Sequence, residues 1–218
     1  MNPVKNHRLG LNGLKSFRMY CLHSLLALVA ISFSAMASAQ APESALAVVQ
    51  QLEQALIQSM KDGAEQGLEQ RRRTLAPIVD ASLNYERMGR FIFGSQWLSF
   101  PDSDRNAFKQ AFRKLSSTNY AARFKKYQGE SFELKNSDAQ GQRRARVRSH
   151  FIKKDGEAIV FDYLLLGENN EWKIVNIIVE GVSDLALKRT QYSGIFKKSG
   201  MSGVIETMAT QEQQLEND

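Results

Sequence analysis

The stretch AIVFDYLLLGENNEWKIVNIIVEGVS, from Ala158 to Ser183, decides the fold of this chain. It contains two strand-length apolar runs, Ala158–Leu166 and Trp172–Val179, on either side of a turn rich in Gly, Asn and Glu. Apolar residues occupy both alternating faces of each run, whereas a strand with one solvated face carries them on one face only. We therefore expect helices or an apolar ligand to cover the face that the core leaves free.

Two further strands are expected before this stretch, which gives an antiparallel meander of four: Glu130–Lys135, Arg143–Ile152, Ala158–Leu166 and Trp172–Val179. Short polar turns join them, and Asp155-Gly156 is the clearest hairpin signal. One face of the second strand carries a basic row, made of Arg144, Arg146, Arg148 and His150. We expect this row to be solvated or to lie at an edge, where it opposes aggregation. Contact with an anionic head group or an acidic partner is the alternative.

Residues 1–39 have the composition of a signal peptide rather than of a folded domain. Four basic residues and no acidic residue precede the apolar run LLALVAISF, and the small-x-small pattern Ala37-Ser38-Ala39 follows it. We expect cleavage after Ala39 and export to the periplasm; a retained anchor is the alternative, but the apolar run is short for one. The single cysteine, Cys21, lies in this segment, so the exported chain needs no disulfide.

The charge balance argues against a nucleic-acid partner. The whole chain carries 29 basic and 23 acidic residues, and removal of the four basic residues of the leader leaves 25 against 23. A net charge of about +2 gives no basic surface of the kind that binds nucleic acid. We expect one domain over residues 40–213, a frayed polar tail over 214–218, and a monomer.

Helical periodicity occurs on both sides of the predicted sheet. Before the sheet, we expect helices from Ser44 to about Met60, from about Glu65 to Pro77, from Asn84 to Gly94, and from Asp102 or Ser103 to about Lys126. After it, we expect a helix that begins at Ser183, a break at Gly200, and a last helix from Met201 to Gln213. Pro77 should stop or kink its helix. A helical N-terminal half, a four-stranded antiparallel sheet and C-terminal helices together make an α+β fold.

The inventory of reactive side chains argues against most enzyme classes. The exported chain has one histidine, His150, and no cysteine, so neither a zinc site nor a cysteine nucleophile is expected. No G-x-S-x-G or phosphate-binding glycine motif is present, and we expect no cofactor. The best catalytic candidate is Asp162, because a carboxylate in an apolar strand can have a raised pKa and act as a base. A partner arginine or backbone group explains Asp162 equally well.

Two stretches carry a family resemblance. They are NYERMGRFIFGSQW, from Asn84 to Trp97, and FDYLLLGENNEWKIVNIIVEGVSDLALKRTQYSGIFKKSG, from Phe161 to Gly200. Together they resemble the toluene-tolerance or MlaC family of periplasmic phospholipid-binding proteins, in the same order along nearly all of the exported chain. The chain departs from the family at Asn84-Tyr85, where Asp-Phe is common, and at Leu98-Ser99-Phe100, which replaces a more polar stretch; both bear on cargo preference.

The resemblance implies a periplasmic lipid carrier and no enzyme. Family members shuttle phospholipid between an inner-membrane MCE-type ABC transporter complex and an outer-membrane lipoprotein–porin complex, which maintains outer-membrane lipid asymmetry. Acyl chains enter an apolar cavity between the sheet and the helices, and the head group stays exposed. A small acid–base enzyme centred on Asp162, or a carrier of hopanoid or another amphiphile, is the alternative.

Strand alternation and helix periodicity then select the residues expected to line the cavity. They are Phe91, Trp97, Phe112, Leu115, Tyr120, Val147, Phe151, Phe161, Tyr163, Leu165, Ile174 and Ile178. If the cavity lies on the other face of the sheet, four apolar residues replace the strand residues of this set: Val160, Leu164, Val175 and Ile177.

Overall fold

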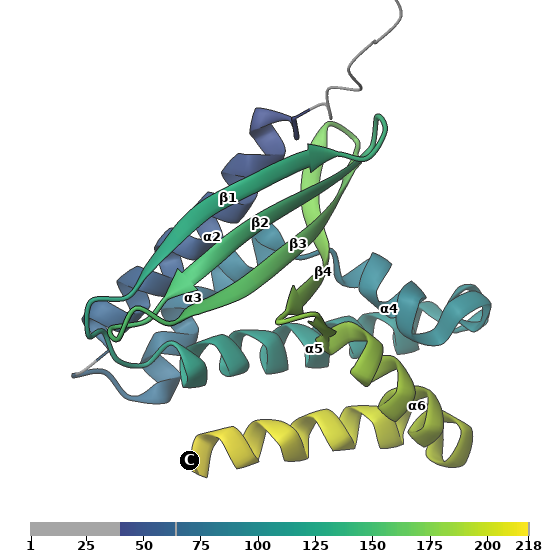
Figure 1. Ribbon diagram of the computed structural model, residues 1–218. Helices are drawn as coiled ribbons and strands as arrows, with labels where there is room; N and C mark the ends of the chain where they lie inside the picture. The colour runs from purple at the N-terminus through teal and green to yellow at the C-terminus, as the bar shows by residue number, and fades with distance from the viewer. Residues whose placement is uncertain (1–39, 64, 218) are drawn as a thin grey trace, which may run out of the picture. The chain divides into compact units, whose positions relative to one another are not determined.

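A five-stranded antiparallel sheet dominates the computed structural model, which describes residues 40–63 and 65–217 (Figure 1). Its strands pair in chain order: β1 (Ser131–Ala139), β2 (Arg144–Ile152), β3 (Ala158–Glu168), β4 (Glu171–Val179) and β5 (Val182–Ser183). The antiparallel meander is therefore confirmed. The predicted signal peptide, residues 1–39, lies outside the described residues.

The sheet has five strands rather than the four predicted, because β5 adds a two-residue strand. Glu180 and Gly181 both have positive φ, 50° and 77°, and reverse the chain within two residues. Such two-residue turns match the twist of a hairpin. Val182 then pairs with Val179, and Ser183 pairs with Ile178. This hairpin delivers the chain directly into the helix that follows.

Five α-helices and one 3₁₀ helix accompany the sheet in the described part of the chain. They are α2 (Glu43–Asp62), α3 (Leu68–Ser82), α4 (Tyr85–Phe93), η1 (Gly94–Ser99), α5 (Asp102–Arg123) and α6 (Asp184–Asn217). Asn84 caps α4 by accepting a hydrogen bond from the Arg87 amide at 3.0 Å, as its position predicts. The helical N-terminal half and the α+β class are thus confirmed.

Pro77 does not stop its helix: α3 continues through it to Ser82. Proline removes one amide hydrogen bond, here to the carbonyl of Arg73, and both residues are exposed, so water can satisfy that carbonyl. Leu75 and Val79 are buried on the opposite side of the helix and hold it in place.

The C-terminal helix α6 doubles back at Gly200, where the predicted break is confirmed by non-helical dihedrals of 64° and −165°. Its second half is held against α5: Lys114 pairs with Glu212 at 2.9 Å, and the Thr118 hydroxyl lies 3.2 Å from the Glu212 carboxylate. The helix continues to Asn217, so it includes most of the segment that we expected to be a frayed tail.

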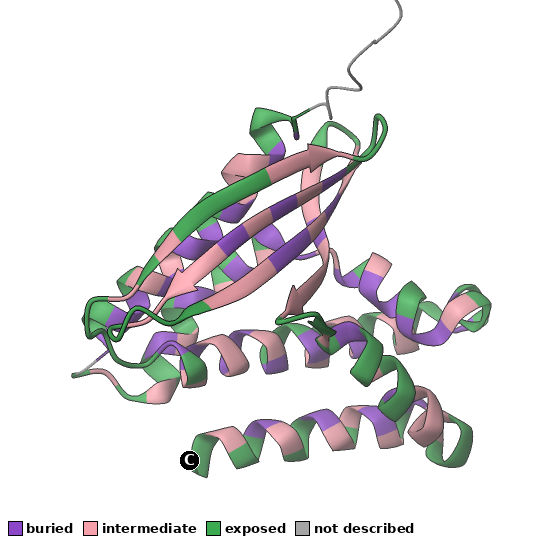
Figure 2. Cartoon of the chain, viewed as in Figure 1, coloured by how far each residue is buried: buried purple, intermediate pink, exposed green. Residues whose placement is uncertain are grey.

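One face of the sheet packs into the core. The strand register puts alternate residues of β2 beside alternate residues of β3 on this inner face, for example Val147 beside Tyr163 and Ala145 beside Leu165. These four residues are buried. Figure 1 shows α2 and α3 on one side of the sheet, and Figure 2 shows buried residues alternating with half-buried ones along β2 and β3.

The outer face is covered by charged side chains of the sheet itself, and α2 and α3 lie on the other side of the sheet (Figure 1), so the expectation of helices over the outer face is wrong for the described residues. Arg148 donates two hydrogen bonds to Asp162 on β3, at 2.8 and 2.7 Å, and Arg146 pairs with Asp138 on β1 at 2.8 Å. Arg146 lies opposite Leu164 in the register. Long arginine stems can shield aliphatic neighbours while their charged ends stay in water.

A β-bulge in β4 changes which residues of this strand face inward. Leu165 pairs with Ile174 while Leu164 pairs with Asn176, so Val175 is an extra residue. After the bulge Ile177 pairs with Tyr163 on the inner face, and Ile178 pairs with outer-face Asp162. Simple alternation assigns Ile178 to the face of Ile174, and the bulge makes that assignment wrong.

Candidate functional site

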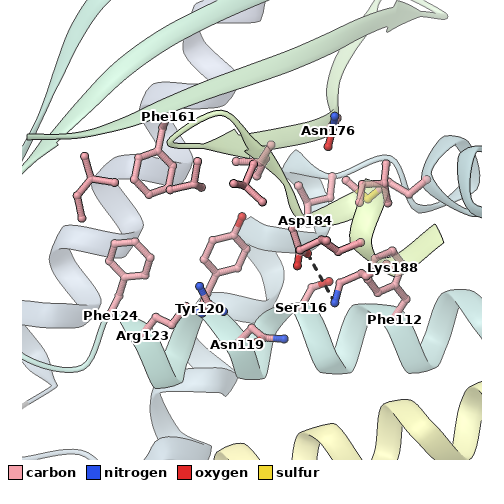
Figure 3. A pocket seen from close by; sticks show the side chains of 18 of the residues that line it. Phe112, Ser116, Asn119, Tyr120, Arg123, Phe124, Phe161, Asn176, Asp184 and Lys188 are labelled. Atoms are coloured by element: carbon pink, nitrogen blue, oxygen red, sulfur yellow. Dashed lines mark ion pairs between the residues drawn. The ribbon is translucent and has the colours of Figure 1, made fainter. Parts of the chain in front are cut away.

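A pocket of about 500 Å³ lies between the inner face of the sheet, α5 and the beginning of α6 (Figure 3). The strands contribute Phe151, Ile159, Phe161, Asn176, Ile177 and Val179. Helix α5 contributes Phe112, Ser116, Asn119, Tyr120 and Arg123, followed by Phe124. The remaining wall comes from Leu83, Met88, Val182, Asp184, Leu185, Leu187 and Lys188. Its volume is in the range of small-molecule sites, about 300–1,000 Å³.

Helical periodicity explains the α5 wall. Phe112, Ser116, Asn119 and Arg123 recur every three or four residues and therefore share one face of the helix. Phe108 and Leu115, one turn before and one turn after Phe112 on nearly the same face, are buried and fix α5 in the core. The same helix thus anchors itself in the core and presents a mixed aromatic and polar face to the pocket.

Aromatic rings close one end of the pocket. Phe124 meets Phe151 edge-on with 5.7 Å between ring centroids, and Phe161 stacks with Tyr163 at 6.1 Å. Phe132 lies behind them, 5.0 Å from Phe151. Aromatic contacts of this kind are favourable beyond the area that they bury. This end is therefore a fixed apolar wall.

The pocket opens to solvent beside β5 and α6. Two of its apolar lining residues, Val182 and Leu187, are 54% and 60% exposed, so the rim carries apolar side chains in water. Soluble proteins seldom leave such side chains together at a cavity mouth without a ligand or partner surface to meet them.

Four of the twelve predicted residues line the pocket: Phe112, Tyr120, Phe151 and Phe161. Six others are at most 1% exposed and belong to the core away from it: Trp97, Leu115, Val147, Tyr163, Leu165 and Ile174. Ile178 lies on the outer face because of the bulge. Phe91 is on the surface of α4 and is 40% exposed, with the Arg189 guanidinium 5.4 Å from its ring.

The position of a residue along its strand explains why six core residues were predicted to line the cavity. Alternation identifies the face of a residue, but it does not say which part of that face another element covers. Helix α2 covers the part around Tyr163, where it brings Glu53 next to the tyrosine. The pocket uses the other end of the same face, at Phe161 and Ile159.

Several lining residues were not predicted. Ile159 shares the face of Phe161, so the alternation already pointed to it. Ile177, which was named only in the alternative set for the other face, and Val179, which was not named, face the pocket because of the bulge, which the sequence does not reveal. Leu185 and Lys188 are three residues apart on α6, so they share one face of this helix, and this spacing could have indicated from the sequence that both face the pocket.

A buried carboxyl group lies behind the inner face. Glu53 of α2 is 6% exposed, and burial raises its pKa to about 7, while Ser149 and Tyr163 nearby partly offset that rise. Within the described residues, neither Glu53 Oε1 nor Ser149 Oγ has a hydrogen-bond partner. Buried polar atoms without partners lower stability, so this site carries an energetic penalty.

The catalytic candidate Asp162 and the histidine of the exported chain, His150, lie outside the pocket. Asp162 is on the outer face, where Arg148 holds both of its oxygens, and His150 is on the same outer face opposite Val160. Among residues 40–63 and 65–217, no three or more His, Cys, Asp or Glu side chains are grouped so that they could hold a metal ion. The lining of the pocket is thus suited to binding an apolar ligand.

None of the helices in the described region is both long enough and apolar enough to cross a membrane.

The sequence model of the family described as MlaC protein matches residues 50–210. This chain belongs to the MlaC family. The match includes both stretches on which the resemblance was stated, Asn84–Trp97 and Phe161–Gly200, so the resemblance is confirmed.

One curated protein is similar to this MlaC-family chain in sequence, and one solved structure is similar to it in fold. The intermembrane phospholipid transport system binding protein MlaC of Haemophilus influenzae is 26% identical over 141 residues, which cover 63% of this chain and 64% of that protein. A phospholipid-binding protein from Ralstonia solanacearum, solved in complex with a phospholipid, superposes with a TM-score of 0.69 at 18% identity. That superposition covers 78% of this chain and 98% of the other, and it confirms the fold.

Proposed function

We propose that this MlaC-family chain is a phospholipid carrier, and that the pocket between α5 and the sheet holds acyl chains. The observation that carries the proposal is the pocket itself: an aromatic closed end, mostly apolar walls and an exposed apolar rim at Val182 and Leu187. Two similar proteins support the proposal: the H. influenzae protein is a phospholipid transport system binding protein, and the R. solanacearum protein was solved with a bound phospholipid.

The lining residues proposed to contact the chains differ from the predicted set. They are Phe112, Tyr120, Phe151 and Phe161 from that set, joined by Met88, Ile159, Ile177, Val179 and Leu185. The six core residues and Ile178 are proposed to support the walls without touching the lipid.

The energetics of a carrier favour an apolar pocket of this kind. Burying about 30 methylenes at roughly 0.8 kcal/mol each is worth about 24 kcal/mol relative to water. No noncovalent complex reaches an affinity of that size. The relevant reference is the membrane, where the chains already lie in hydrocarbon, so transfer to the protein is close to neutral. The carrier needs only to shield the chains in transit and release them at its destination.

The route of transport is also part of the proposal. A leader with a cleavage pattern after Ala39 and the membership in the family favour a periplasmic protein. We infer that it exchanges lipid with an inner-membrane MCE-type ABC transporter complex and an outer-membrane lipoprotein–porin complex, as a monomer, and thereby maintains outer-membrane lipid asymmetry. We infer no catalytic role, since Asp162 is paired with Arg148 on the face away from the pocket.

The cargo of the purified protein tests this proposal. We expect native mass spectrometry of protein isolated without detergent to show close to one phospholipid per chain, and organic extraction to identify it. Recovery of a hopanoid or another amphiphile in place of phospholipid would move the proposal to that cargo. A chain that stays empty after incubation with phospholipid vesicles would overturn it.

A further inference from the structure

Lys188 occupies an unusual place for a lysine, at the wall of an apolar pocket. Its side chain is 13% exposed, and it lines the pocket from the second turn of α6. The ammonium lies over two aromatic faces, 5.8 Å from the ring centroid of Phe112 and 5.7 Å from that of Tyr192. Rings within about 6 Å attract a cation, so they help to hold the ammonium at this wall.

The charge of Lys188 is only loosely compensated. Asp184 Oδ2 lies 3.6 Å from its Nζ, beyond the 2.7–3.2 Å of a hydrogen bond, and the Asp184 side chain is 69% exposed. Within the described residues, the ammonium has no hydrogen-bond acceptor although it carries three donors. By contrast, Lys114 lies 2.9 Å from Glu212 and Lys109 lies 3.1 Å from Glu86.

The surroundings suit an oxyanion that enters from the mouth. Ser116 on the facing helix lines the same pocket, and its hydroxyl can donate a further hydrogen bond. Figure 3 shows Ser116 and Lys188 pointing toward the same end of the pocket, with the ion pair to Asp184 drawn as a dashed line. A mostly desolvated ammonium gains more from a charged acceptor than an exposed one does.

The pocket is polarised along α5. Phe112, beside Lys188, and Phe124, in the aromatic wall, are twelve residues apart, which is about 18 Å along a helix at roughly 1.5 Å per residue. One end therefore carries the mostly buried Lys188 ammonium, and the other carries the aromatic wall, beside which the exposed Arg123 also lines the pocket. An amphiphile with an anionic head and apolar tails matches this order.

We infer that Lys188 binds the phosphate group of the lipid, and that it makes this carrier prefer phosphate-bearing lipids to phosphate-free diacyl lipids. This inference rests on the proposed function, because it names the head-group chemistry of the same pocket. The Asp184 carboxylate limits the affinity for the phosphate, so the anchor stays weak enough to release its cargo.

A competition experiment tests the inference. Delipidated protein is equilibrated with an equimolar mixture of phosphatidylglycerol and diacylglycerol of the same chain length, and the bound lipids are counted by native mass spectrometry. We expect Lys188→Met to lower the ratio of phosphatidylglycerol to diacylglycerol about tenfold, the effect of a hydrogen bond to a charged group. Lys188→Arg should retain most of the wild-type ratio. Lys198→Met, an exposed site on the same helix, should leave the ratio unchanged.

Three outcomes have distinct meanings. An unchanged lipid ratio in Lys188→Met overturns the inference and leaves the carrier proposal standing. A wild-type protein that binds neither lipid overturns the carrier proposal itself. Inorganic phosphate that raises the Tm of empty wild-type protein as much as phosphatidylglycerol does, and fails to do so in Lys188→Met, assigns the site to a free anion and overturns its lipid specificity.

A second measurement does not depend on how much the variant is destabilised. The phosphorus NMR line of bound phosphatidylglycerol reports whether the phosphate is held or mobile. We expect a broad line in wild-type protein and a markedly narrower one in the folded fraction of Lys188→Met. Equal line widths would contradict a contact between Lys188 and the phosphate.

Discussion

Ile177 and Ile178 are consecutive residues on opposite faces of β4: Ile177 lines the pocket, and Ile178 pairs with outer-face Asp162. Both are half-buried. The bulge at Val175 sets this arrangement, since it shifts the alternation of the strand by one residue. The pair therefore offers two substitutions of the same chemistry, one inside the pocket and one outside it.

We expect Ile177→Asn to reduce co-purified lipid by roughly 5- to 150-fold, because it puts an amide among the acyl chains, where an unpaired polar group costs roughly 1–3 kcal/mol. Ile178→Asn should keep near wild-type lipid. Native mass spectrometry of both variants measures the occupancy, and thermal unfolding verifies that each is folded. Equal lipid in the two variants would place the lipid elsewhere.

Gly89 and Trp97 give a prediction on stability alone. A Cβ on Gly89 would lie 2.6 Å from Cη2 of the Trp97 ring, which is fully buried and donates a hydrogen bond to Glu86 at 2.5 Å. We expect Gly89→Ala to lower the free energy of unfolding by about 1–3 kcal/mol through overpacking.

Gly194 is the matched control for this substitution. It is also helical, and nothing lies within 4 Å of where its Cβ would be. Gly194→Ala should raise the free energy of unfolding by about 0.5–1 kcal/mol, the difference in helix propensity. Urea unfolding of both variants measures the two changes; a stabilised Gly89→Ala would contradict the packing described for α4.

Glu53 makes stability depend on pH. Its pKa is about 7 in the folded chain against 4.5 as its ordinary value, so the folded state binds more protons than the unfolded state between these limits. Stability therefore falls as pH rises from about 4.5 to 7, and the full loss is present above 7. At about 1.36 kcal/mol for each pKa unit, the loss is about 3 kcal/mol.

Glu53→Gln should remove this dependence. We expect the variant and the wild type to differ in unfolding free energy by about 3 kcal/mol more at pH 8 than at pH 4.5, with the variant favoured as pH rises. Urea unfolding across this range measures the difference. Parallel stability curves would show that Glu53 is not buried as described.

Asp162→Asn separates the carrier from an acid–base enzyme. The residue accepts two hydrogen bonds from Arg148 on the outer face and is not among the residues that line the pocket. We expect a loss of about 1 kcal/mol of stability, in the range of partly exposed ion pairs, and unchanged lipid occupancy. Loss of bound lipid in a folded Asp162→Asn variant would contradict the assignment of the pocket to the inner face.

Much of the fold could be predicted from the sequence, because its strands and helices have clear periods. The Ala158–Val179 hairpin, the cap at Asn84 and the break at Gly200 each follow from local residue chemistry. The two-residue strand β5 is too short to show a period. The charged cover of the outer face depends on pairings between strands, such as Arg148 with Asp162, that only the register decides.

The candidate site was harder to predict for a physical reason. Buried apolar residues that fill a core and those that line a cavity have the same periodicity. Tyr163 and Phe161 share a face of β3, and only the position of α2 makes the first a core residue and the second a pocket residue. Lys188 is a charged residue, so the periodicity of apolar residues does not identify it as part of the pocket.

The most direct test of the account is to find where an acyl chain lies in the protein. A phospholipid with a photoreactive group near the end of one chain is loaded, irradiated, and mapped by peptide mass spectrometry. We expect attachment to the aromatic end of the pocket, at Phe124, Phe151 or Phe161. Attachment to outer-face residues such as Val160 or Leu164, with none in the pocket, would contradict the account.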